Sequence, residues 1–196
     1  MLSKQAKVLS SQQITAVLNS FRGSRNAARN TVIFLLSLHG LRAKECAELQ
    51  LSMITDCEGN LTEAIALEDK ASKGDSGRVV PMNKALQIAL KEYLAERNGN
   101  SPYVIVSERS ERFSANAIAV FFKRLYNSLG FTGCSSHSGR RTFLTNCARK
   151  VSQAGGSIRD VMALAGHKNL QTTQRYLDQD AEAQKNLVKM LYAAVF

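Results

Sequence analysis

Apolar residues recur at helical spacing along most of this chain, in segments separated by glycines and short polar residues. Ser10 and Gln13 have the spacing of a capping box at a helix start, and Gly40 and Gly130 follow the ends of two later apolar stretches. Each stretch places its apolar side chains on one face, which is typical of helices packed around a core. The pattern predicts helices that start near Ser10, Asn26, Arg42, Asn83, Ser114, His137, Ser157 and Asn169, and an amphipathic segment at 180–196.

The period changes in the middle of the chain. Residues 61–68 and 78–82 alternate as strands do, and residues 69–77 contain the glycines and short polar side chains of a hairpin turn. A strand near 53–56 would complete a small three-stranded antiparallel sheet, and the apolar run 103–106 is typical of a short buried strand. We therefore expect a mainly α (α+β) fold, in which helices surround a small sheet.

Composition and charge narrow the class of protein. The 196 residues fit one domain, 1–196, without linkers, repeats or low-complexity segments, and 44% hydrophobic content favours a globular chain over a disordered one. Lys and Arg outnumber Asp and Glu by 26 to 16, which gives a net charge of +10. This excess favours a polyanionic partner, most often nucleic acid; the alternative is a basic protein without such a partner.

The cysteines and the apolar runs indicate in which cellular compartment the protein is found. Cys46, Cys57, Cys134 and Cys147 form no Cys-x-x-Cys pair, so we expect reduced thiols and no metal site. The N-terminus has no apolar signal core, and the run at 32–38 is too short to span a bilayer. We expect a cytoplasmic protein that does not bind membranes.

Four side chains that can bind or attack a phosphate fall between positions 137 and 176. His137 and Arg140 are three residues apart, so on a helix they would share a face and hold one small anion. His167 follows a glycine in a break between two helical patterns, and Tyr176 falls on the predicted helix after it. Two imidazoles, a guanidinium and a phenol are the groups of a phosphate-handling site.

With two earlier fragments, these residues resemble the catalytic domain of the tyrosine recombinases, the phage integrase family. That family has an arginine in a Gly-Leu-Arg-x-x-Glu context, a lysine in a turn between strands, a His-x-x-Arg box, a Gly-His pair, and a tyrosine nine residues after that histidine. The matching residues here are Arg42 with Glu45, Lys73, His137 with Arg140, Gly166 with His167, and Tyr176. Each fragment alone is weak, whereas five in the correct order are specific.

The resemblance implies a site-specific DNA recombinase that needs no metal, cofactor or ATP. Tyr176 would attack the scissile phosphate to form a 3′-phosphotyrosyl link, and Lys73 would donate a proton to the leaving 5′-oxygen. Arg42 and Arg140 would bind the phosphate and stabilise the charge of the transition state. The sequence also has no dense carboxylate cluster to hold Mg²⁺, which argues against a two-metal nuclease.

The remaining roles are supporting ones. By the same resemblance His137 and His167 would hydrogen-bond the phosphate and help in proton transfer, and Glu45 would orient its neighbours. Lys70 lies in the same turn as Lys73, which complicates the assignment of that lysine. Taken singly, most of these residues would have an ordinary structural role. The cationic residues expected to contact DNA outside the catalytic set are Lys44, Lys70, Arg141, Lys168 and Arg175.

Two features depart from the family pattern. Ser138-Gly139 replaces the acidic and aliphatic pair that is common inside the His-x-x-Arg box, and glycine weakens a helix there. The residues before Arg42 are too few for the separate N-terminal DNA-clamping domain of most members. The chain is therefore expected to be either a fragment or one of the short members that lack this domain.

The family resemblance also implies partners. We expect double-stranded recombination sites and assembly into a dimer or tetramer on them, in a bacterial or phage-encoded protein that works at the nucleoid. The tail at 180–196 would either pass to a neighbouring subunit or pack on its own domain. Two other functions stay open: a type IB topoisomerase that relaxes supercoils as a monomer, and an inactive DNA-binding regulator of the same fold.

Overall fold

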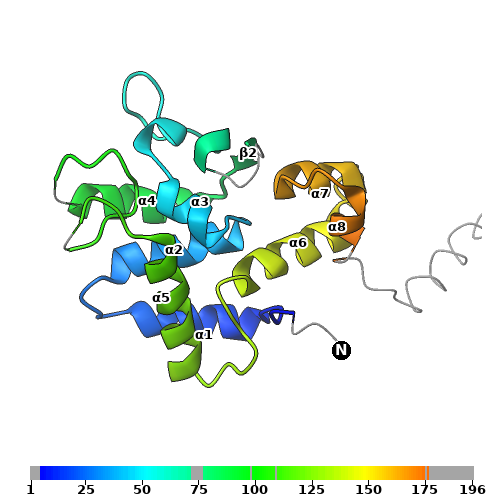
Figure 1. The fold of residues 1–196 in the computed structure, drawn as a ribbon, viewed down its shortest axis with the longest axis horizontal. Helices are drawn as coiled ribbons and strands as arrows, with labels where there is room; N and C mark the ends of the chain where they lie inside the picture. Colours follow the sequence, from blue (N-terminus) through cyan, green and yellow to red (C-terminus); the bar gives the residue numbers. More distant parts are fainter. Residues whose placement is uncertain (1–4, 72–76, 98, 109, 175, 177–196) are drawn as a thin grey trace, which may run out of the picture.

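The computed structural model of the protein describes residues 5–71, 77–97, 99–108, 110–174 and 176. It is mainly helical with a small antiparallel sheet, so the expected fold class is confirmed (Figure 1). The helices are α1 (Ser11–Phe21), α2 (Ala27–Leu38), α3 (Ala43–Glu48), α4 (Lys84–Glu96), α5 (Ala115–Ser128), α6 (Ser138–Lys150), α7 (Ile158–Ala165) and α8 (Leu170–Gln174). The strands are β1 (Ala64–Leu67) and β2 (Arg78–Pro81), with short 3-10 turns η1 (Leu51–Met53) and η2 (Asp69–Ala71).

Side-chain caps start several helices where the sequence predicts them. The N–H of Gln13 donates to the Ser10 hydroxyl and the N–H of Ser10 donates to the Gln13 side chain, which completes the predicted capping box of α1. Asn83 and Ser114 likewise accept backbone N–H groups three residues ahead, at 2.9 and 3.1 Å, and start α4 and α5. These starts follow from local hydrogen bonding.

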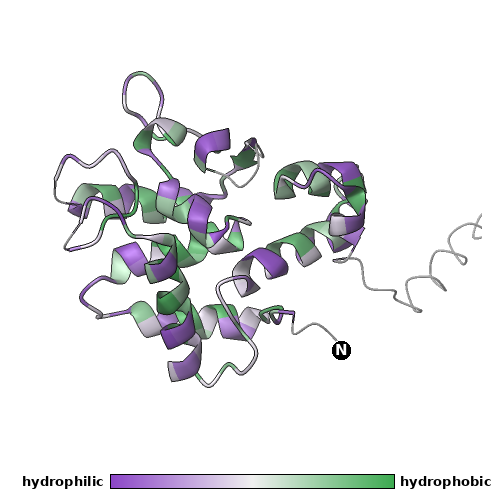
Figure 2. Cartoon of the chain, viewed as in Figure 1, coloured by the Kyte–Doolittle hydropathy of each residue, from purple (hydrophilic) through white to green (hydrophobic). Residues whose placement is uncertain are grey.

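Two hydrophobic clusters hold the helices together. In the larger cluster α2 is central: its residues 32–37 are buried, and it packs against α1, α4 and α6. The smaller cluster lies where α6 meets α7 and contains Leu144, Ala148, Val161 and Ala165. Helix α6 therefore packs against α2 and also against α7, and α7 and α8 stand to one side of the main body (Figure 1). Polar and apolar residues share each of these helices (Figure 2).

The sheet turns one face to the larger cluster. Strands β1 and β2 are antiparallel, with Ile65 opposite Val80 and Leu67 opposite Arg78. Ile65, Leu67 and Val80 are buried, whereas Val79 is 62% exposed, as the two-residue period of a strand requires. Arg78 lies two residues before Val80 and so starts on the same inward face.

The prediction of a strand near residues 53–56 was wrong. Residues Leu51–Met53 form the 3-10 turn η1, and Met53 and Ile54 are both buried in succession, which a one-sided strand does not allow. Thr55 makes only an isolated antiparallel bridge with Leu61. Among the described residues the sheet therefore has two strands, because the backbone bonds of this segment close a local turn.

The apolar run at 103–106 is also no extended strand. Tyr103 forms a single antiparallel bridge with Gln50, and Val104 and Ile105 are fully buried in the larger cluster. The run is apolar because it fills the core, and a short core segment and a short strand have the same composition.

The cysteines are free thiols: Cys46 is buried, Cys57 is exposed, and Cys134 and Cys147 are partly buried. Burial raises the pKa of the Cys46 and Cys147 thiols. None of the described helices combines the length and the apolar character needed to cross a bilayer.

Candidate active site

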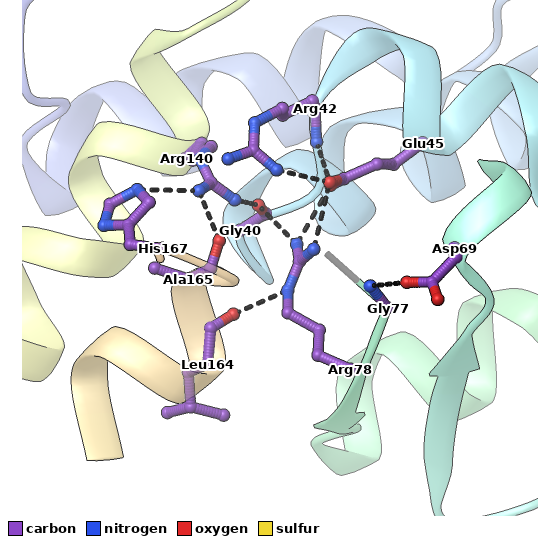
Figure 3. A network of polar contacts seen from close by, with 10 residues as sticks. All are labelled: Gly40, Arg42, Glu45, Asp69, Gly77, Arg78, Arg140, Leu164, Ala165 and His167. Carbon is purple, nitrogen blue, oxygen red and sulfur yellow. Dashed lines mark hydrogen bonds and ion pairs between the residues drawn. The ribbon is translucent and has the colours of Figure 1, made fainter. Parts of the chain in front are cut away.

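Arg140 lies on α6 and joins the ends of two other helices. Its side chain donates to the carbonyl of Gly40, just beyond α2, and to the carbonyl of Ala165 at the end of α7, at 2.6 Å. It also contacts Nε2 of His167 at 3.1 Å (Figure 3). Gly40 has a left-handed backbone, with φ of +85°, which directs the chain from α2 toward α3. Arg140 is 4% exposed, so its guanidinium is held inside the fold.

Glu45, on α3, is the carboxylate around which the other arginines gather. Its side chain is fully buried; it accepts the N–H of Arg42 at 2.8 Å, the Arg42 guanidinium at 2.5 Å, and the two terminal nitrogens of Arg78 at 2.9 Å each (Figure 3). Burial opposes ionisation of Glu45, but the hydrogen bonds and charges of Arg78 and Arg42 outweigh it and lower its pKa to about 2. The Arg42–Glu45 pair is therefore no ordinary surface ion pair.

Arg78 is a site residue that the sequence interpretation missed. Its side chain is 4% exposed, forms a bidentate pair with Glu45, and donates through Nε to the carbonyl of Leu164 at 2.8 Å. The two-residue alternation of the strand could have identified it: Arg78 lies two residues before buried Val80 and therefore falls on the inward face of β2. An arginine at such a position needs a buried acidic partner, and Glu45 supplies it.

The cluster carries more positive than negative charge. Arg42 and Arg78 pair with the carboxylate of Glu45, and Arg140 lies close enough to interact with its charge, so three positive charges surround one negative charge. Burial, followed by the charge of Arg42, lowers the pKa of Arg140 to about 10, which leaves it protonated at neutral pH. A bound anion would relieve this excess, and guanidinium groups present paired donors that fit phosphate oxygens.

His167 lies at the edge of the arginine cluster. Gly166 ends α7 in the left-handed conformation, with φ of +61°, so the chain turns and places His167 beside Arg140. The His167 ring stacks on the ring of Tyr176, with centroids 5.9 Å apart and an interplanar angle of 19°. Burial, then the charges of Arg140, Arg42 and Arg78, lowers the pKa of His167 to about 4, so its imidazole is neutral at neutral pH.

Tyr176 lies just beyond the described part of α8. That helix ends at Gln174, and the N–H of Tyr176 donates to the carbonyl of Thr173 at 3.0 Å in a turn. The expectation that Tyr176 falls on the helix is therefore corrected for the described residues. The half-buried ring also packs against the smaller hydrophobic cluster, so α6 and α7 fix its position.

A pocket of about 350 Å³ opens over these residues. It brings together five of the six predicted catalytic side chains, with Arg141 and the N-terminal segment completing its wall. The lining residues are Gln5, Ala6, Arg42, His137, Arg140, Arg141, His167, Thr172 and Tyr176. His137 is the N-cap residue of α6 and is exposed, whereas Arg140 is buried, so the two face the pocket from different depths.

The sixth predicted catalytic residue, Lys73, lies outside the described residues, as do Arg175 and the tail at 180–196. The neck of its hairpin is described: the N–H of Gly77 donates to the Asp69 carboxylate at 2.8 Å, directly beside Arg78 (Figure 3). Gly77, the first described residue after Lys73, is therefore the direct chain neighbour of Arg78 in the arginine cluster.

Of the predicted DNA-contacting residues, four lie in the described part of the chain, and only Arg141 of these lines the pocket. Lys44, on α3, is exposed. Lys168 is exposed and lines a neighbouring groove between β2 and α7. Lys70 is 64% exposed and pairs with Glu68 at 2.7 Å. Their roles toward DNA stay predictions.

Comparison with known proteins adds to this geometry. Residues 7–183 match the model of the phage integrase family. The chain is 30% identical over 154 residues to the tyrosine recombinase XerA of Pyrococcus horikoshii, covering 77% of the chain and 50% of that protein. It is 27% identical over 179 residues to the TnP I resolvase of Bacillus thuringiensis, covering 89% of the chain and 58% of that protein. The chain therefore spans little more than half the length of these relatives. The fold is similar to that of the Tn1549 transposon integrase solved with circular intermediate DNA, with a TM-score of 0.73 and 18% identity over 97% of this chain and 68% of that one.

Proposed function

Because this chain belongs to the phage integrase family, we propose that it is the catalytic domain of a site-specific DNA recombinase, with residues 1–196 as one domain. The observation that carries the proposal is the shared pocket, where a phenol, two imidazoles and guanidinium groups meet. These are the groups required to cut a phosphodiester by attack of a side chain and to hold the charge that develops on phosphorus oxygens.

The proposed chemistry conserves the energy of the DNA backbone. The Tyr176 oxygen bonds to phosphorus as the bond to the 5′-oxygen breaks, which gives a 3′-phosphotyrosyl link and a free 5′-hydroxyl. The proton on that hydroxyl comes from Lys73, and the phenolic proton passes to a neighbouring base. A second 5′-hydroxyl then reverses the attack and rejoins the strands without ATP.

The arginines serve this reaction by charge and position. Arg42 and Arg140 bind the non-bridging oxygens and stabilise the pentavalent transition state, with His137 and His167 as further hydrogen-bonding groups. Glu45 holds the Arg42 side chain from below at 2.5 Å. The pocket is thus organised before DNA arrives, so little reorganisation is needed during the reaction.

Double-stranded recombination sites are the proposed partner. The net charge of +10 favours a polyanion, and the structurally similar Tn1549 integrase was solved with DNA. Within the cytoplasm, we propose assembly into a dimer or tetramer on paired sites, with cationic contacts from Lys44, Lys70, Arg141, Lys168 and Arg175.

A nicked substrate that traps the covalent intermediate tests the function. Incubated with a cognate site, the protein should form a DNA adduct that Tyr176→Phe abolishes, because only the phenolic oxygen is removed. Tyr103→Phe is the matched control, since Tyr103 is not among the residues that line the pocket and its substitution should leave the adduct unchanged. An adduct that persists in Tyr176→Phe would overturn the assignment, and site-independent plasmid relaxation would indicate a topoisomerase instead.

A further inference from the structure

Thr173 contacts both the histidine and the tyrosine of the pocket, although the pocket lining does not include it. Its side chain is fully buried, and its Oγ1 lies 2.9 Å from Nδ1 of His167. Its backbone carbonyl accepts the N–H of Tyr176 at 3.0 Å. One residue of α8 therefore contacts the ring of His167 and the backbone of Tyr176.

The partners of His167 decide which of its nitrogens carries the proton. On the opposite side of the ring, Nε2 faces the guanidinium of Arg140 at 3.1 Å. Guanidinium groups have donors and no acceptor, so Nε2 must be the accepting nitrogen of a neutral ring. The hydrogen then sits on Nδ1 and is donated to Oγ1 of Thr173.

We propose that Thr173 is a positioning residue that holds His167 as the neutral Nδ1–H tautomer, with the lone pair of Nε2 turned toward Arg140 and the pocket. This inference rests on the proposed function and deepens it, because it assigns the direction in which His167 handles protons. The lowered pKa of His167 agrees with a neutral ring.

The consequence concerns the phenolic proton of Tyr176. In this tautomer Nε2 can accept a proton and cannot donate one, so His167 begins as a base. Once the Arg140 guanidinium donates to a bound phosphate instead, Nε2 is free to take the proton of the Tyr176 oxygen. That oxygen bonds to phosphorus as the bond from phosphorus to the 5′-oxygen breaks, and the ring, now a cation, donates to the phosphate. The stacked rings and the backbone bond from Tyr176 to Thr173 keep both groups on one short segment.

Two substitutions separate hydrogen bonding from packing at this position. Thr173→Val keeps the shape and the methyl group but removes the hydroxyl, whereas Thr173→Ser keeps the hydroxyl and removes the methyl group. If the role is packing in the buried site, serine is the damaging change. If the hydroxyl holds His167, valine is the damaging change, and cleavage of the nicked substrate should fall about tenfold, as expected for one lost hydrogen bond.

Ring nitrogen NMR of the full chain, labelled with ¹⁵N, reads the tautomer directly. The sequence has three histidines, so substitution of each one in turn assigns the signals. The wild type and Thr173→Ser should show a His167 Nδ1–H that exchanges slowly with water, and Thr173→Val should lose it. His39 is the internal control: its Nδ1 lies 2.8 Å from the Leu35 carbonyl, so its signal should persist in every variant and report that the fold is intact.

The result that overturns the proposal is equally direct. A wild-type His167 protonated on Nε2, or a Thr173→Val protein that keeps both the Nδ1–H signal and the cleavage rate, excludes this role for Thr173. Greater damage from serine than from valine excludes it as well. The NMR measurement needs no DNA, so it decides the role of Thr173 even if the wild type forms no adduct and the proposed function fails.

Discussion

At the scale of single residues, Glu45 shows how a buried charge can organise a site. A carboxylate without solvent contact is costly unless it is paired and fully hydrogen-bonded. Glu45 meets that condition through Arg42, the N-cap residue of α3, and Arg78, on β2. The two arginines are in turn stabilised by the carboxylate. Removal of the Glu45 charge should therefore leave Arg42 and Arg78 unpaired and destabilise all three side chains.

We therefore expect Glu45→Gln to lower the free energy of unfolding by about 3–5 kcal/mol, the effect of leaving buried charges unpaired. Glu48→Gln is the control, since the Glu48–Arg112 pair is partly exposed and its loss should change stability by less than about 1 kcal/mol. Urea denaturation at neutral pH measures both. Similar small effects for the two variants would contradict the buried network.

The difference in stability between the wild type and Glu45→Gln should depend on pH. The folded pKa of Glu45 is about 2, below its ordinary value of 4.5, so its contribution is complete above about pH 4.5 and is lost as the pH falls toward 2. The stability gap between wild type and Glu45→Gln should therefore narrow across that range. A gap that stays constant down to pH 2 would show that the charge of Glu45 is not the cause.

At the scale of elements, the glycine inside the His-x-x-Arg box has a packing explanation. A Cβ on Gly139 would lie 2.2 Å from the hydroxyl oxygen and 2.9 Å from the Cβ of Ser37. Helices α2 and α6 are thus in close contact one residue before Arg140. Glycine at position 139 departs from the family pattern and weakens the helix locally, but it permits this close approach. The close approach of α6 to α2 in turn helps to bury Arg140.

Gly139→Ala should destabilise the protein by about 1–3 kcal/mol through this overlap. The direction of this change in stability is informative, because alanine in a helix is otherwise favoured over glycine by about 1 kcal/mol. Adding Ser37→Gly removes the two overlapping atoms and should recover part of the loss, whereas Asn146→Ala on the exposed side of α6 should change little. Thermal unfolding of the four proteins measures these effects; an unaltered or raised stability in Gly139→Ala would refute the contact.

At the scale of the whole molecule, the pocket lies between two hydrophobic clusters and depends on how they are joined. Helix α6 packs against α2 of the larger cluster and α7 of the smaller one, and Arg78 adds a polar link. From β2 it binds Glu45 of α3 and the Leu164 carbonyl at the end of α7. The position of His167, three residues beyond Leu164, therefore depends on a strand far from it in sequence.

Arg78→Lys keeps the charge but cannot reach Glu45 through two nitrogens and Leu164 through a third. Amide hydrogen exchange in α7 should then accelerate about tenfold, as expected for the loss of about 1.4 kcal/mol of local stability, while exchange in α4 stays unchanged. Arg97→Lys is the matched control, because Arg97 also donates to backbone carbonyls but in the loop after α4. Equal acceleration of α7 and α4 in Arg78→Lys would indicate general loosening and not a specific link.

Local patterns were sufficient for the helix starts and for the two strands of the sheet. Caps such as those at Ser10 and Asn83 act within three residues, so helix starts can be read from the chain. The alternation around the hairpin likewise predicted β1 and β2. The segment at 53–56 was misassigned because short apolar runs fit both a strand and a buried turn.

By itself, the sequence determined which reactive groups the protein carries and the family order in which they occur, because residue type and spacing are local properties. Only the tertiary structure decided which groups meet. Arg140 reaches the carbonyl of Gly40 across 100 positions, and Arg78 reaches Glu45 across 33 positions and the carbonyl of Leu164 across 86. These contacts depend on how helices and strands distant along the chain pack together, so no spacing along the chain specifies them.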